Sequence, residues 1–148
     1  QQLETAQRMM ELVGIAPLAD RGIRRISGGE RQLALIARAL VQNAEILIMD
    51  EPTANLDFGN QQRVLAQIRA LAARGYTVLL STHNPEHALH YAHRVLALQG
   101  GHIAADGPTE TALTPQLLQT LYGIQAILAE VPTDHGTVRS LIVTEDME

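Results

Sequence analysis

The sequence contains no cysteine and no tryptophan, and only 3% of its residues are aromatic. Without cysteine the chain can form neither a disulfide framework nor a thiolate metal site, and this lack fits a cytosolic compartment. No apolar run approaches the length of about 18 residues that a membrane-spanning helix needs, and no signal-peptide pattern is present. With 46% hydrophobic residues in 148 positions, the composition predicts about one globular domain with its own core.

Lysine is absent as well, because all eleven basic residues are arginine. The phosphate-binding loop with the pattern G-x-x-x-x-G-K-[ST] needs its lysine, so the sequence does not contain such a loop. The net charge of -5 argues against broad binding to the phosphate backbone of nucleic acids. Since Gln1 stands in what reads as the middle of a helix, we expect the sequence to begin inside a larger protein.

Helical and strand patterns alternate along the first part of the chain. Apolar residues at helical spacing predict helices over residues 3–13, 29–42 and 64–72. Two short apolar runs, residues 45–50 and 76–82, predict strands that are buried on both faces, as in a parallel sheet. A strand, a helix and a second strand at this spacing make a βαβ unit with a right-handed crossover. The predicted fold class is therefore α/β.

Turn and cap residues mark the elements of the remaining chain. Asn84-Pro85-Glu86 and Thr114-Pro115 have the form of helix starts, and the second helix should run to about Tyr122. Gly100-Gly101 predicts the turn of one hairpin, and Asp134-His135-Gly136 predicts the turn of a final hairpin.

Polar side chains follow both predicted buried strands. Asp50-Glu51 ends the first strand, and Ser81-Thr82-His83 ends the second. Because parallel strands bring their carboxyl ends to one edge of the sheet, where ligands bind, these groups should share that edge. One acid could hold Mg²⁺ and the other could polarise a water that attacks a phosphoryl group, with the histidine near the phosphate. The alternative is that Asp50 and Glu51 are exposed to solvent at the end of the strand and have no role in binding or catalysis.

The stretch I-S-G-G-E-R-Q at residues 26–32 opens the helix predicted from residue 29. Ser27 and Glu30 fit a capping box, in which each side chain bonds to the backbone of the other residue. A capping box does not need Gly28 and Gly29, and each glycine costs about 1 kcal/mol against alanine in a helix. The two glycines are compatible with a plain cap or with an anion that approaches the helix N-terminus closely.

Three motifs together resemble the ABC-type ATPases. "ISGGERQLALIARAL" is similar to their signature motif, "AEILIMDEPTANLD" to their Walker B strand, catalytic glutamate and D-loop, and "TVLLSTHN" to their switch-histidine segment. Order and spacing fit as well, and the resemblance covers roughly residues 20 to 95. It implies the P-loop NTPase fold of ABC ATPases, with ATP and Mg²⁺ as cofactors.

The resemblance implies a role for each matching residue. In the family, the signature residues contact the γ-phosphate of ATP held by the partner protomer. They correspond here to Ser27, Gly28, Gly29 and Glu30, the last standing where glutamine is common. Asp50 matches the acid that orders Mg²⁺, Glu51 the general base, and His83 the switch histidine; Asn55, Leu56 and Asp57 match the D-loop at the dimer seam.

The family's Walker A loop, Q-loop and adenine-stacking aromatic have no match here. The sequence therefore resembles only the C-terminal half of a nucleotide-binding domain, and alone it should bind ATP poorly and hydrolyse it hardly at all. We expect residues 1–42 to end the helical signature subdomain, 43–110 to belong to the RecA-like core, and 111–148 to form a C-terminal helix and hairpin extension.

The tail, with its "TPQLLQTLYG" helix, is similar to bacterial importer ATPases for iron–siderophore, haem or cobalamin. The resemblance implies two partners, namely a second copy in a head-to-tail dimer and an integral membrane permease. It places the subunit peripherally on the cytoplasmic face of the bacterial inner membrane, without direct membrane insertion or nucleic acid. The alternatives are an importer for molybdate or another metal oxyanion, and a soluble ABC ATPase of the DNA-repair or translation type.

Four histidines, His83, His87, His90 and His93, invite a zinc reading. No carboxylate or cysteine completes an obvious ligand set. We therefore expect His83 to serve as the switch residue and the other three to lie on a solvated helix face.

Overall fold

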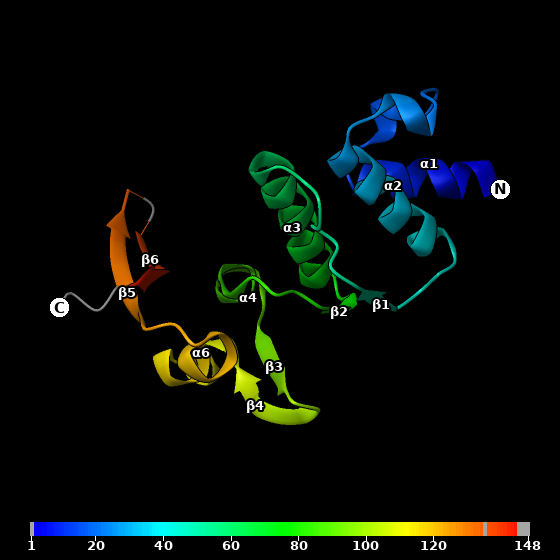
Figure 1. The fold of residues 1–148 in the computed structure, drawn as a ribbon. Coiled ribbons are helices and arrows are strands. Elements are labelled where there is room, and N and C mark those ends of the chain that lie inside the picture. The colour runs from blue at the N-terminus through cyan, green and yellow to red at the C-terminus, as the bar shows by residue number, and fades with distance from the viewer. Residues whose placement is uncertain (1, 135, 145–148) are drawn as a thin grey trace. The chain divides into compact units, whose positions relative to one another are not determined.

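The chain divides between His83 and Asn84 into an N-terminal unit, residues 1–83, and a C-terminal unit, residues 84–148 (Figure 1). The computed structural model describes residues 2–134 and 136–144. Within these ranges, no helix combines the length and the hydrophobicity that crossing a bilayer requires. The subdomain boundaries expected at residues 42 and 110 concern the complete ATPase and stay a prediction.

The N-terminal unit has the α-helices and strands that its sequence predicts, together with two short 3₁₀ helices, η1 and η2, that it does not predict. Its elements are, in chain order, α1 (Gln2–Leu12), η1 (Ala16–Leu18), η2 (Ile23–Arg25), α2 (Gly28–Val41), β1 (Ile46–Met49), α3 (Phe58–Ala73) and β2 (Thr77–Leu80). Gly14, at a φ of +78°, follows the end of α1 as a glycine commonly does after a helix. The predicted α/β class is confirmed.

The strands β1 and β2 pair in parallel, with the helix α3 between them in the chain. Their register runs from Ile46 opposite Thr77 to Met49 opposite Leu80. One more ladder bond follows, because the Ser81 N–H donates to the Met49 carbonyl at 2.9 Å. Both strands therefore end at the same edge, as the sequence predicts.

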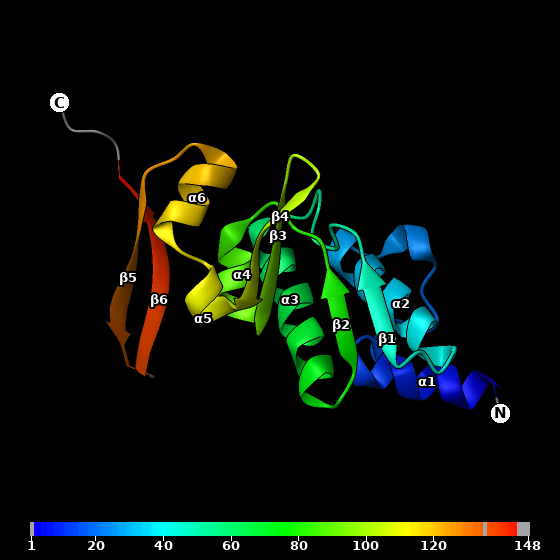
Figure 2. The same ribbon diagram turned by 90° about the horizontal axis from the view of Figure 1, so that it is seen from below.

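The two strands are not buried on both faces, and that prediction is wrong for this structure. One face packs on α2 and α3, which lie on the same side of the strand pair (Figure 2). The other face is open: the exposed fractions of Ile46, Ile48 and Leu79 are 60%, 77% and 57%. The described residues of the N-terminal unit supply helices to one face only, so the apolar side chains of the other face stay in contact with solvent.

The core of the N-terminal unit forms where α1, α2, α3 and the inner face of the strands meet. Its buried residues are Val13, Ile15, Leu33, Ile36, Ala37, Leu40, Leu47, Val64, Ile68 and Leu71. Burial of each such aliphatic side chain contributes about 1.5–3 kcal/mol relative to exposure. This packing fixes α2 and α3, whose N-termini carry the candidate binding residues described below.

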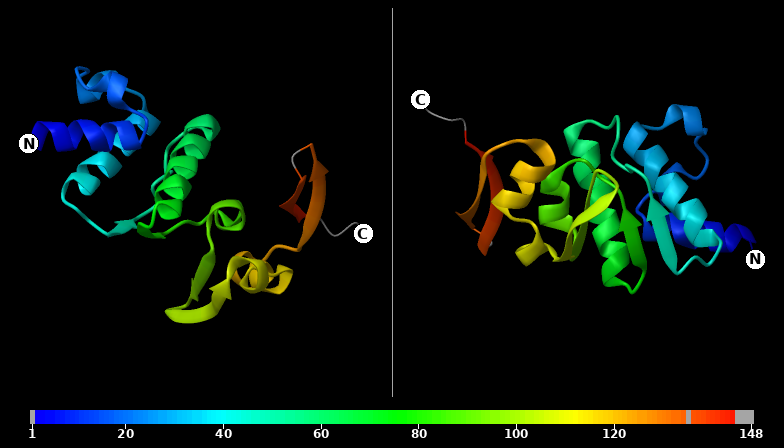
Figure 3. Two further views of the ribbon diagram at one scale, coloured as in Figure 1. Left: turned by 180° about the vertical axis from the view of Figure 1, so that it is seen from behind. Right: turned by 60° about the horizontal axis from the view of Figure 1, so that its bottom comes forward.

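The C-terminal unit contains two hairpins with short helices between them in the chain (Figure 3). Its elements are α4 (Pro85–Tyr91), β3 (Arg94–Gln99), β4 (His102–Pro108), α5 (Thr109–Ala112), α6 (Pro115–Tyr122), β5 (Ala126–Thr133) and β6 (Gly136–Val143). Both hairpins are antiparallel. The turn predicted at Gly100-Gly101 is confirmed, with φ angles of +56° and +78°.

A second core lies around α6. Leu113, Leu117 and Leu118 pack there with Ala97 of β3 and Ala126 of β5. The predicted helix starts are confirmed, because the Asn84 side chain accepts from the Glu86 N–H and the Thr114 side chain from the Leu117 N–H. The final hairpin is present too, although His135 of its predicted turn lies outside the described residues.

Candidate functional site

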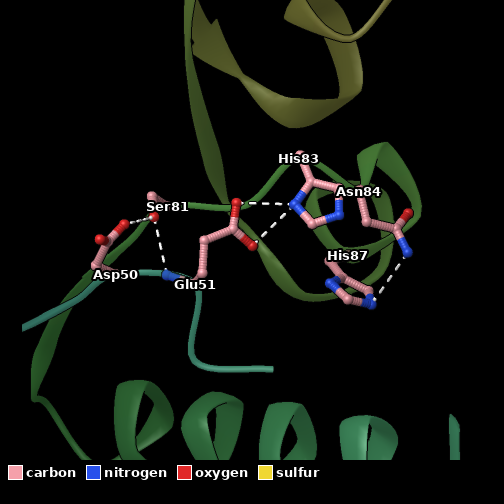
Figure 4. A network of polar contacts seen from close by, with 6 residues as sticks. All are labelled: Asp50, Glu51, Ser81, His83, Asn84 and His87. Carbon is pink, nitrogen blue, oxygen red and sulfur yellow. Dashed lines mark hydrogen bonds and ion pairs between the residues drawn. The ribbon is translucent and has the colours of Figure 1, made fainter. Parts of the chain in front are cut away.

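The acidic end of β1 contacts the polar end of β2 through one hydroxyl group. The Ser81 hydroxyl donates to Asp50 Oδ1 at 2.5 Å, and its oxygen accepts from the Glu51 N–H at 2.9 Å (Figure 4). The register of the two strands explains these contacts. Met49 pairs with Leu80, so the residues that follow them, Asp50 and Ser81, lie next to one another. The structure thus brings together the edge residues that the sequence predicts.

Glu51 and His83 face one another at this edge. His83 Nδ1 lies 2.8 Å from Glu51 Oε1 and 3.0 Å from Oε2 (Figure 4). The His83 side chain is 81% exposed and that of Glu51 is 34% exposed. A carboxylate held against an imidazole at the rim of a sheet is accessible to a ligand and can accept a proton from water.

The backbone of Glu51 has an unusual conformation. Its φ is +45°, in the left-handed region that non-glycine residues seldom adopt. Asn55 in the following loop has a φ of +60°, which asparagine tolerates better than glutamate. Such backbone conformations cost about 1–3 kcal/mol and cluster at functional sites.

Ser81 is the residue of this cluster that the sequence reasoning did not assign a role. The only signal available was its place directly after the second apolar run, beside Thr82 and His83. Its two bonds span 31 and 30 residues of sequence. Residues this far apart in the sequence follow no helical or strand periodicity. The contact depends on the register of the two strands, so only the structure shows it.

The N-terminus of α2 is closed by the predicted capping box. Ser27 Oγ accepts from the Glu30 N–H at 3.2 Å, and Glu30 Oε2 accepts from the Ser27 N–H at 2.7 Å. The pKa of Glu30 is held below its ordinary value, mainly by the hydrogen bond from the Ser27 N–H and to a lesser extent by the bond with the Ser27 side chain. The structure therefore contains the helix cap that the sequence predicts. The cap does not exclude an anion at the N-terminus of α2.

Gly28 and Gly29 fit against the loop and helix that follow β1. A Cβ at Gly29 would lie 2.5 Å from Asn60 Oδ1 and 3.0 Å from the Asn60 Cβ. A Cβ at Gly28 would lie 2.8 Å from Leu56 Cδ2. Close packing within the chain is thus one physical reason for both glycines, in addition to the ligand approach that the sequence suggests.

Asp57 caps α3 with its side chain. Its Oδ1 accepts from the Asn60 N–H at 2.9 Å, and its Oδ2 accepts from Asn60 Nδ2 at 2.5 Å. The pKa of Asp57 is held below its ordinary value, mainly by the hydrogen bond from the Asn60 N–H and to a lesser extent by the bond from the Asn60 side chain. The start of α2 and the start of α3 are therefore joined through Asn60, which touches Gly29 and bonds to Asp57.

Within the described ranges, no group of three or more His, Cys, Asp or Glu side chains is placed to hold a metal ion by itself. Mg²⁺ commonly uses one or two carboxylates and completes its shell with phosphate oxygens and water. Asp50 fits that pattern, because Ser81 bonds to its Oδ1 and leaves Oδ2 for a cation. A cation here would depend on the ligand that brings the phosphates.

The expectation for the remaining histidines is partly wrong. His93 is exposed but lies beyond the end of α4 at Tyr91 and not on a helix face. His87 is buried at 6% exposure, and its Nε2 lies 3.2 Å from Asn84 Nδ2 (Figure 4). His90 Nε2 lies 2.7 Å from a Glu86 carboxylate oxygen. His87 is buried and bonds to Asn84 at the start of α4, so it does not lie on a solvated face.

Comparison with known proteins places this geometry in a class. A solved structure described as a metal-chelate type ABC transporter in an inward-facing conformation matches with a TM-score of 0.89 and 28% identity, over 97% of this chain and 57% of that chain. The fold is thus that of part of an ABC ATPase cassette. The family profile described as "ABC transporter" matches residues 1–54.

Two curated relatives illustrate the sequence similarity. The hemin import ATP-binding protein of Rhodococcus jostii is 36% identical over 129 residues, covering 87% of this chain and 44% of that protein. The phosphonates import ATP-binding protein of Paraburkholderia xenovorans is 46% identical over 115 residues, covering 77% and 38%. The chain covers less than half the length of these two relatives. It belongs to the family of ABC transporter ATP-binding subunits.

We predict that Gly29→Ala lowers the free energy of unfolding by about 1–3 kcal/mol, because the new methyl group overlaps Asn60. Gly59 is the matched control, since it is also the second residue of its helix and a Cβ there would lie 3.5 Å from its nearest neighbour. Gly59→Ala should be neutral or gain up to about 1 kcal/mol. Urea unfolding measures both, and equal stability of the two variants would contradict the close packing at Gly29.

We predict that Asp57→Asn reduces the loss of stability in acid. The folded-state pKa of Asp57 is depressed below the ordinary 3.8, so its contribution is complete above that pH and disappears as the pH falls through the folded value. Asparagine caps about as well as aspartate but does not titrate there. The decrease in unfolding free energy from pH 6 to pH 3 should be smaller in Asp57→Asn than in the parent protein. An equal decrease in the two proteins would contradict this role of Asp57.

Proposed function

We propose that this chain is the part of a bacterial ABC importer's ATP-binding subunit that carries the signature, Walker B, D-loop and switch-histidine segments. The observation that supports this most strongly is the cluster at the carboxyl edge of β1 and β2. There Glu51 faces His83 at 2.8 Å, and Asp50 accepts a hydrogen bond from the Ser81 hydroxyl. The complete subunit would hydrolyse ATP to ADP and phosphate.

In this proposal Glu51 acts as the general base. Its carboxylate accepts a proton from the water that attacks the γ-phosphorus, while the bond to the leaving ADP oxygen breaks. His83 orients the Glu51 carboxylate and contacts the γ-phosphate with its exposed ring. Asp50 would hold Mg²⁺, which neutralises charge on the phosphate oxygens when it is bound.

The signature residues would act on a second copy of the subunit. Backbone N–H groups at the start of α2 and the partial positive charge of the helix suit a γ-phosphate. Ser27, Gly28, Gly29 and Glu30 would contact ATP held by the partner, and Asn55 and Asp57 would lie at the dimer seam. Closure and reopening of this head-to-tail dimer would drive an integral membrane permease, with the subunit peripheral on the cytoplasmic face of the inner membrane.

For the cargo, we propose a metal chelate such as an iron–siderophore, haem or cobalamin. The relative named for hemin import and the metal-chelate type transporter support this class. The 46% identity with a phosphonates import protein supports a phosphonate as the second candidate. The names of the three proteins compared above give no support to a molybdate importer or to a soluble ABC ATPase.

The experiment that tests the activity uses Glu51→Gln in the complete subunit that contains residues 1–148. Loss of the general base should lower kcat for ATP hydrolysis by about 10²–10⁴-fold, while ATP binding and the ATP-dependent dimer persist. Glu45→Gln is the matched control, because Glu45 is exposed and directly precedes β1, at the opposite end from Glu51. The proposal fails if the unaltered subunit does not hydrolyse Mg-ATP or if both variants keep full activity.

The cargo is tested by deleting the gene in its host. We expect loss of growth on a haem or siderophore iron source, with growth on phosphonate as the sole phosphorus source unaffected. The opposite pattern would assign the transporter to phosphonate.

A further inference from the structure

The Ser81 hydroxyl bonds to both acidic residues of the candidate site, to the Asp50 carboxylate and to the Glu51 backbone N–H. Ser81 is the first residue after β2, and its N–H makes the last ladder bond, to the Met49 carbonyl at 2.9 Å. This bond fixes the Ser81 backbone directly beside Asp50. The position of its side chain is therefore determined by the sheet and not by a flexible loop.

The two bonds of the Ser81 hydroxyl are of different kinds. The O–H donates to Asp50 Oδ1 at 2.5 Å, and the oxygen accepts from the Glu51 N–H at 2.9 Å (Figure 4). A hydroxyl is a side-chain group that donates and accepts from one atom, and neither an amine nor a carboxylate could do both. In such a chain each hydrogen bond polarises the next, so the bonds strengthen one another.

The bond to the Glu51 N–H acts on a strained residue. Glu51 has a φ of +45°, and its backbone is held on both sides: the N–H by Ser81, and the carbonyl by the Ala54 N–H at 2.9 Å. This conformation aims the Glu51 carboxylate at His83. A change at Ser81 should therefore move the carboxylate, although Ser81 itself does not touch it.

We propose that Ser81 is a positioning residue for ATP hydrolysis, setting the orientation of the Asp50 carboxylate and of the Glu51 backbone with a single hydroxyl group. This rests on the proposed function of the site. Ser81 would not contact the nucleotide or the attacking water. Its effect would appear in the chemical step and hardly in nucleotide binding.

The experiment compares Ser81→Ala, Ser81→Thr and Ser140→Ala in the complete subunit that contains residues 1–148. Ser81→Ala removes the hydroxyl, and Ser81→Thr keeps it. Ser140→Ala makes the same chemical change on β6, far along the chain from both acids. If Ser81→Ala does not fold, Ser81→Cys takes its place, since the thiol has a similar shape and bonds only weakly.

We expect kcat of Ser81→Ala to fall about 10–100-fold, the range for a hydrogen bond to a charged group, with KM for Mg-ATP changed by less than about threefold. Ser81→Thr should recover most of the activity, and Ser140→Ala should match the parent. A kcat of Ser81→Ala within about twofold of the parent overturns the proposal. So does an equal loss in Ser81→Ala and Ser81→Thr, because the hydroxyl would then be present without effect.

A second readout does not depend on activity. With ¹⁵N-glutamate labelling, the Glu51 amide should exchange with solvent at least about tenfold faster in Ser81→Ala than in the parent, because its acceptor is lost. Unchanged exchange would overturn the contact itself. If the unaltered subunit has no ATPase activity but the Glu51 amide responds as expected, the proposed function has failed while the positioning of Glu51 by Ser81 stands.

Discussion

The parallel register of β1 and β2 is the constraint on which the candidate site depends. Met49 pairs with Leu80, so the next residue of each strand, Asp50 and Ser81, must meet at the edge. A slip of one residue would turn every side chain to the opposite face, and Asp50 would lose its partner. The burial of Leu47 against the helices opposes such a slip, so hydrophobic packing and the polar site specify the same register.

A second link joins the start of α2 to the start of α3. Gly29 accommodates the Asn60 side chain, and Asn60 is bonded twice to Asp57. Two segments that the family resemblance treats as separate motifs are therefore in physical contact within one chain. The lack of a side chain at Gly29 is what allows the first turn of α2 to lie this close to Asn60.

Local rules account for what the sequence predicted well. The capping box of Ser27 and Glu30, the cap at Asn84 and the turn at Gly100-Gly101 depend on residues a few positions apart. The meeting of Asp50-Glu51 with His83 followed from strand topology together with the family resemblance.

What escaped prediction depends on packing between distant residues. The bonds of the Ser81 hydroxyl and the contact of Asn60 with Gly29 join residues far apart in the sequence, and the burial of His87 has no local signature. The apolar runs of β1 and β2 predicted two covered faces, whereas the described helices cover one. An apolar run shows that a strand can be buried on both faces. Whether both faces are buried depends on whether helices pack against each of them.

The open face of the strand pair has a consequence for the behaviour of the chain in water. Ile46, Ile48 and Leu79 present adjoining β-branched and leucine side chains with no charge among them. Contiguous apolar surface of this kind drives association with whatever apolar surface is nearby. Residues 1–148 in isolation should therefore bind hydrophobic dyes and self-associate as their concentration rises, and a mild detergent or a covering polypeptide should reverse both effects.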